Sequence, residues 1–312
     1  MTFDPVAWFI APLDYQFMVR AVVMAALLGI SGGLVGVVLV LRRLSLMADS
    51  FGHALLPGIG IAYLLFGISL GGMLAGAAIA GLLTALASGL VSRLTRLGED
   101  ASFAAFFTMF VAIGVALLSR AAAPVDLLHY LFGNILGITS ADLMLSATVT
   151  TVTVIAFAVG WRWIVLECFD RAFFKACGGP SALTHMGLLT LTVANLVSAM
   201  QAVGAMLSVA LFILPAATSY LWCERFVHMV VFAGSWGSLA AVFGLYVSFH
   251  TDLPSGACIV GVLGAGFLTT IAVSPRHGLL RRWTGGSRHL REDAAGDCPV
   301  AHGADPHGHA HH

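Results

Sequence analysis

The sequence predicts an all-α integral membrane protein, a bundle of eight or nine transmembrane helices with one short re-entrant or interfacial helix. Apolar residues make up 59% of the 312 residues, charged residues make up 10%, and the mean hydropathy is +0.95. A soluble globular protein carries roughly 25% charged residues, so this chain has too few to coat a surface that faces water.

The apolar residues fall into nine long stretches, and a membrane span needs about 20 mostly apolar residues. The run from Met186 to Trp222 is too long for one helix, so we divide it near Gln201–Gly204, and eight spans are the alternative. The segment 124–139 is too short and too polar to span, which favours the re-entrant or interfacial helix. The expected spans are 17–41, 49–68, 70–92, 101–120, 140–162, 184–202, 203–222, 227–249 and 255–273.

The distribution of Lys and Arg predicts the orientation, because cytoplasmic loops carry an excess of these residues. With the N-terminus outside and nine spans, only Arg20 and Arg120 of the 15 Lys and Arg residues fall on the outer side. The cytoplasmic membrane is therefore the expected location, with a multi-pass topology and a cytoplasmic C-terminus.

The chain divides into a transmembrane domain at 1–275 and a polar tail at 276–312, which we expect to be cytoplasmic and disordered. Neutral imidazole is a good ligand for Zn²⁺, so the tail histidines are candidates for a weak metal trap, and an inert tail is the alternative. These histidines are His302, His307, His309, His311 and His312.

The second expected span carries Asp49 and His53, four residues apart and hence on one face of a helix. An ionisable residue inside a membrane helix is costly and by default suggests a function. A carboxylate and an imidazole form half of a shell for Mn²⁺, Fe²⁺ or Zn²⁺, and a second protomer on a two-fold axis would supply the rest. A helix cap at Asp49 with a satisfied His53 is the alternative.

Several other polar features have a structural explanation at least as good as a functional one. Pro57 is expected to kink its helix, either to free a carbonyl group or only for packing. The pair Glu99 and Asp100 suggests a solvated charge cluster beside Arg93 and Arg96. Two outer pairs could meet an arriving cation or be satisfied at the surface, namely Asp126 with His129 and His250 with Asp252.

Missing motifs limit the possible functions. The chain has no phosphate-binding loop of the G-x-x-x-x-G-K-[ST] type, so any ATP hydrolysis must take place in another polypeptide. It has no HExxH motif, and we expect no enzyme activity and no permanently bound cofactor. A net charge of zero argues against nucleic-acid binding.

Four motifs resemble the ABC-3 permeases, the membrane subunits of zinc, manganese and iron(II) importers of the type II importer class. They are LRRLSLMADSFGHALLPGIGIAYLL (41–65), PVDLLHYLFGNILGITSADL (124–143), QAVGAMLSVALFILPAATSYL (201–221) and DLPSGACIVG (252–261). The resemblance implies a homodimer with two cytoplasmic ATP-binding subunits and an external solute-binding protein. It also implies that Asp49 and His53 lie on the metal path.

The segment CFDRAFFKACGG (168–179) is similar to the loop with which these permeases dock into the ATPase. Phe169, Asp170, Lys175 and Gly178 match the family pattern, whereas Phe174 stands where the family has a small residue.

The expected function is the import of Zn²⁺ or Mn²⁺, or of Fe²⁺, by alternating access. Coordination in the path is expected to be weak, since an ion held too tightly cannot leave. A permease for a metal chelate, a proton-coupled secondary transporter and an intramembrane metalloenzyme are the alternatives.

Overall fold

The computed structural model describes residues 11–45, 50, 54–67, 69–120 and 137–273. All regular elements in these ranges are helical. After a short 3-10 helix η1 (Ala11–Asp14), the α-helices are α2 (Gln16–Leu41), α4 (Leu56–Phe66), α5 (Leu70–Leu94), α6 (Glu99–Arg120), α8 (Ser140–Phe169), α9 (Arg171–Ala176), α10 (Ser181–Val203), α11 (Ala205–Trp222), α12 (Phe226–Thr251) and α13 (Ser255–Val273).

Six of these helices are long and apolar enough to cross a membrane: α2, α5, α8, α10, α12 and α13. Shorter apolar helices cover Pro57–Phe66, Asp100–Gly114 and Met206–Trp222. The predicted all-α architecture with long apolar helices is therefore confirmed, and the count of eight or nine spans stays a prediction. The predicted segment 124–139 and the tail lie almost wholly outside the described residues.

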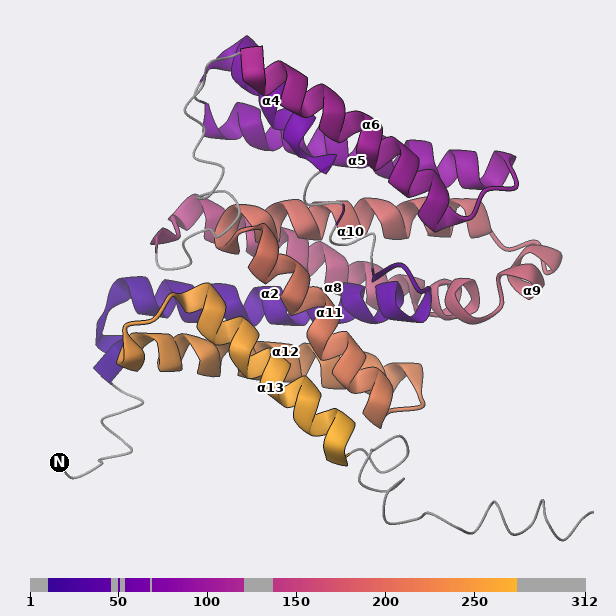
Figure 1. Ribbon diagram of the computed structural model, residues 1–312. Coiled ribbons are helices and arrows are strands. Elements are labelled where there is room, and N and C mark those ends of the chain that lie inside the picture. The colour runs from indigo at the N-terminus through magenta and orange to yellow at the C-terminus, as the bar shows by residue number, and fades with distance from the viewer. Residues whose placement is uncertain (1–10, 46–49, 51–53, 68, 121–136, 274–312) are drawn as a thin grey trace, which may run out of the picture.

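The division of the long run at Gln201–Gly204 is confirmed. Helix α10 ends at Val203 and α11 begins at Ala205, with Gly204 between them at φ +82°. A backbone angle in this region is costly for residues with a side chain, so glycine allows the chain to change direction without a loop. Helix α11 then runs obliquely across the bundle (Figure 1).

Helix α2 lies at the centre of the bundle and packs against α8, α10, α11 and α12. A Cβ on Gly33 would lie 2.5 Å from the backbone nitrogen of Gly234 in α12, and one on Gly36 would collide with the carbonyl oxygen of Phe212 in α11. Small residues let helix backbones approach closely in lipid, where no hydrophobic force drives helices together.

Helix α8 is longer than predicted, because it continues seven residues beyond the expected end at 162 to Phe169. The predicted span ended at Arg162. In the structure Arg162 is exposed, whereas Glu167, which lies further along the same helix, is buried. The helix therefore extends past the apolar stretch into a polar end of the bundle.

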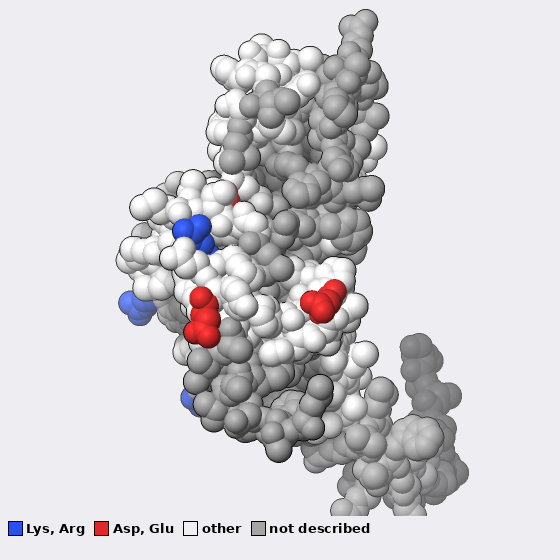
Figure 2. All heavy atoms as spheres, turned by 90° about the vertical axis from the view of Figure 1, so that its left-hand side faces the viewer, with Lys and Arg blue, Asp and Glu red and all other residues white. Residues whose placement is uncertain are grey.

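Basic residues gather at this end, which we call the α9 end. Hydrogen bonds, ring contacts and a shared pocket bring together the ends of α2, α5 and α8 with the starts of α6, α10 and α12. Its described basic residues are Arg42, Arg43, Arg93, Arg96, Arg171, Lys175 and Arg225. The opposite end shows few charged side chains among its described residues (Figure 2).

We predict that Gly33→Ala destabilises the bundle, because its Cβ meets α12 backbone that cannot move away cheaply. Overpacking of this kind costs about 1–3 kcal/mol, and the melting temperature of the purified protein should fall by several degrees. Gly261→Ala in α13 is the matched control, since its Cβ meets nothing within 4 Å. Equal melting temperatures for the two variants would contradict the close approach of α2 and α12.

Candidate functional site

The predicted metal ligands Asp49 and His53 lie outside the described residues. The chain that follows them is buried, with Ala54 at 0% and Leu55 at 2% exposure. Helix α4 then begins at Leu56 with Pro57 in its first turn. There its missing N–H breaks no hydrogen bond within α4. Ala54 before it is helical, Leu55 forms a turn, and 51–53 lie outside the described residues, so the predicted kink stays a prediction.

Helix α4 is held tightly between α5 and α6. A Cβ on Gly58 would collide with the carbonyl oxygen of Gly76 in α5, and one on Gly114 of α6 would lie 2.8 Å from the nitrogen of Pro57. The start of α4, next to the predicted metal pair, is therefore fixed by backbone contacts on two sides.

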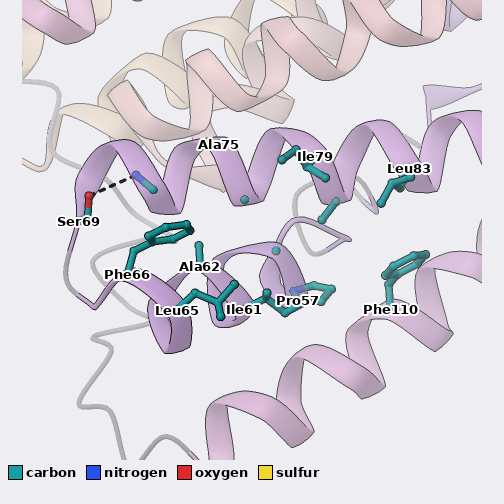
Figure 3. A pocket seen from close by; sticks show the side chains of 14 residues that line it. Pro57, Ile61, Ala62, Leu65, Phe66, Ser69, Ala75, Ile79, Leu83 and Phe110 are labelled. Atoms are coloured by element: carbon teal, nitrogen blue, oxygen red, sulfur yellow. Dashed lines mark hydrogen bonds between the residues drawn. The ribbon is translucent and has the colours of Figure 1, made fainter.

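An apolar groove of about 530 Å³ lies between α4, α5 and α6 (Figure 3). Ile61, Leu65 and Phe66 of α4 face Ile79 and Leu83 of α5 across it. Its described lining has no ionisable side chain, so this groove suits hydrocarbon and does not supply metal ligands. Within the described residues, no group of three or more His, Cys, Asp or Glu side chains could hold a metal ion.

The end of the bundle opposite to α9 contains a polar contact that the sequence analysis did not identify. Gln201 of α10 donates to Asp142 of α8 over 2.6 Å, and Asp142 also forms a capping box with Thr139. Both residues lie inside motifs that carry the family resemblance, which was the available signal. Their pairing depends on the packing of α8 against α10 and could not be read from spacing.

The other predicted outer residues are partly described. Asp126 and His129 lie outside the described residues. His250 and Asp252 are exposed at the end of α12, where Asp252 has a left-handed backbone with φ +54°. This turn therefore ends α12, and a cation site there stays a prediction.

The predicted ATPase-docking segment forms a helix–turn unit at the α9 end. Phe169 ends α8 and is 60% exposed. The Asp170 carboxylate accepts from the Phe173 backbone N–H over 2.8 Å and so caps α9, while Lys175 is exposed in its last turn. Phe169, Phe173 and Lys175 thus offer two aromatic rings and a positive charge to the surroundings.

Phe174, which departs from the family pattern, points inward and is 3% exposed. Its ring occupies the space where a side chain at Gly179 would lie. Gly178 adopts φ +73°, which lets the chain turn from α9 towards α10. The larger residue is therefore accommodated within the segment and does not alter its exposed surface.

Beneath this segment lies a buried ionic cluster that the sequence analysis missed. The Glu167 side chain is 0% exposed, and its Oε1 accepts from Arg171 Nε at 2.8 Å and lies 3.8 Å from Arg93 Nη2. The i, i+4 spacing of Glu167 and Arg171 was the one signal in the sequence. Arg93 is only 17% exposed and turns to Glu167, whereas Asp100 and Arg96 are exposed as predicted.

A polar pocket of about 520 Å³ adjoins the cluster. Arg42 and Arg43 from the end of α2, Asp100 from α6 and Glu167 line it together with Phe169. Charged groups and an exposed aromatic ring therefore border one cavity next to the docking segment.

Comparisons with known proteins identify the family of this chain. The sequence matches the ABC 3 transport family over residues 14–274. It is 34% identical over 268 residues to the "Manganese transport system membrane protein MntC" of Listeria monocytogenes, covering 86% of this chain and 94% of that protein. It is 34% identical over 269 residues to the "Chelated iron transport system membrane protein YfeC" of Yersinia pestis, covering 86% of this chain and 90% of that protein.

Among solved structures, "PsaBC from Streptococcus pneumoniae in complex with Fab" is similar with a TM-score of 0.76 and 29% identity, covering 89% of this chain and 99% of that chain. An inward-facing conformation of a putative metal-chelate type ABC transporter shares the fold, with a TM-score of 0.67 at 16% identity. With six helices among the described residues able to span a membrane and a family match over residues 14–274, the chain belongs to the ABC 3 transport family of membrane permeases.

Proposed function

We propose that this chain is the membrane-spanning permease subunit of an ATP-binding cassette importer that moves Mn²⁺, Zn²⁺ or Fe²⁺ across the cytoplasmic membrane. The family match over residues 14–274 carries this proposal. The names of similar permeases from Listeria and Yersinia support a metal as the substrate, because they specify manganese and chelated iron.

Asp49 and His53 are proposed to bind the ion in transit, with both protomers of a homodimer contributing a pair. A four-ligand shell of carboxylate and imidazole suits these ions, and its few ligands leave the ion free to move on. The rigid packing at the start of α4 supports this role, since it would hold the second ligand of the pair in place.

Nine spans with the α9 end in the cytoplasm form the proposed topology. The gathering of basic residues at the α9 end supports it, because positive charge is retained on the cytoplasmic side. The tail, with His302, His307, His309, His311 and His312, would then also lie in the cytoplasm.

The segment 169–178 is proposed to dock into one of two ATP-binding subunits, and the opposite end to receive a metal-loaded solute-binding protein. Exposed Phe169 and Phe173 support docking, because aromatic side chains are enriched at the centres of protein interfaces.

A metal chelate is the second candidate substrate, favoured by the similarity to a permease named for chelated iron. A bulky chelate brings its own ligands, so it would not require Asp49 or His53.

Metal uptake by cells that express the permease with its partner subunits tests this function. Asp49→Ala and His53→Ala should each lower uptake of the transported ion at least about tenfold, because loss of a ligand should cost no less than loss of an outer-shell partner. The assay would use trace Mn²⁺, Fe²⁺ and Zn²⁺, with membrane expression checked for every variant.

Arg162→Gln, an exposed charge in α8 away from the proposed path and from both docking ends, is the control and should leave uptake unchanged. Undiminished uptake of the free ions in both site variants would contradict the assigned ligands. If wild type takes up only an inert chelate, the chelate function replaces the one proposed.

Accessibility of Cys177 tests the topology and the docking segment, because this thiol is exposed at the end of α9. In a variant with Cys168, Cys223, Cys258 and Cys298 replaced by Ser, a membrane-impermeant maleimide should modify Cys177 in inside-out vesicles and not in intact cells. Added ATP-binding subunits should slow the modification. Rapid labelling in intact cells would contradict the orientation.

A further inference from the structure

We propose that Glu167 and Arg171 are positioning residues that couple ATP hydrolysis to transport, by fixing helix α9 to α5, α8 and α10. This inference rests on the proposed function, in which the segment around α9 docks into the ATP-binding subunit. It concerns how movement of that segment reaches the rest of the permease.

Helix α9 needs external support, because it has only six residues. Isolated helices shorter than about 12 residues are marginal even for favourable sequences. The Asp170 cap and the buried Phe174 ring hold the helix to its own connections. Arg171 bonds it to α8 and α10 through Glu167 and His185.

The Glu167 carboxylate lies between guanidinium groups from two helices, α9 and α5. A fully buried carboxylate is costly unless it is paired, and an apolar cluster would often be at least as stable. The ionic cluster is therefore poorly explained by stability alone. Its charges do make the position of α9 dependent on α5 and α8.

Both arginines also bind the first turns of α10. Arg93 Nη2 donates to the Ser181 carbonyl oxygen over 3.0 Å, and Arg171 Nη2 lies 3.1 Å from His185 Nδ1. Arginine can only donate, so Nδ1 of the fully buried His185 acts as the acceptor, and the neutral ring carries its proton on Nε2. A shift of α9 therefore acts directly on the start of α10.

Helix α10 is bonded to α8 again in its last third, just before the Gly204 break. Asn195 Nδ2 donates to Thr153 Oγ1 over 2.7 Å, the Ser146 and Ser198 hydroxyl groups are 2.8 Å apart, and Gln201 bonds Asp142 over 2.6 Å. Helix α10 is thus held at both ends, by Arg171 near its start and by α8 near the Gly204 break, and it runs beside α8 between them (Figure 1). Motion transmitted through Arg171 would therefore arrive at the opposite end.

The test uses the complete transporter in liposomes and measures metal ions moved per ATP hydrolysed. In Glu167→Gln and Arg171→Gln, ATP hydrolysis should stay within about twofold of wild type while ions per ATP fall roughly tenfold, within the usual range of coupling between sites. Arg171→Lys, which keeps the charge, should recover part of the ratio. Arg162→Gln, an exposed α8 residue outside the cluster, is the matched control and should match wild type.

A purely structural role predicts a different result. Fewer folded transporters would lower hydrolysis and transport together, so unchanged ions per ATP in both variants would overturn the proposal. If Glu167→Gln does not assemble, Arg171→Gln decides, because Arg171 is one-third exposed and its loss disturbs the interior less. A wild-type complex that moves no metal would instead refute the proposed function.

Discussion

Close contact between helix backbones is the constraint on which the rest of this bundle depends. Lipid offers no hydrophobic driving force between helices, so association depends on packing and on hydrogen bonds. Glycines of α2 place its backbone against α11 and α12, and Gly58 with Gly76 does the same for α4 and α5. Only helices this close can exchange bonds such as that from the Ser238 hydroxyl to the Ala26 carbonyl oxygen.

The long helices were predictable because each coincides with an apolar run of membrane length. Predicted and observed ends of α2 and α13 agree within one residue, and the break at Gly204 followed from a run too long for one helix. The end of α8 was missed, because Arg162 and Glu167 look like loop residues in a sequence. In the fold, partners from α5 and α9 compensate the buried carboxylate.

The site was predictable where it is local and unpredictable where it depends on tertiary contacts. Family motifs singled out the segment 168–179, in which Asp170 caps α9, and its docking role stays a prediction. The partners of Glu167 and Asp142 come from helices distant in sequence, so no spacing rule could identify Arg93 or Gln201. The metal pair Asp49 and His53 lies outside the described residues and stays a prediction.

The contact between Phe174 and Gly179 has a consequence for how this segment changes during evolution. The ring fills the volume that any side chain at 179 would need, so the two positions share one fixed space. A lineage that acquires a large residue at one position must keep a small one at the other. Substitutions at 174 and 179 should therefore occur as compensating pairs, a constraint that the exposed residues around them do not share.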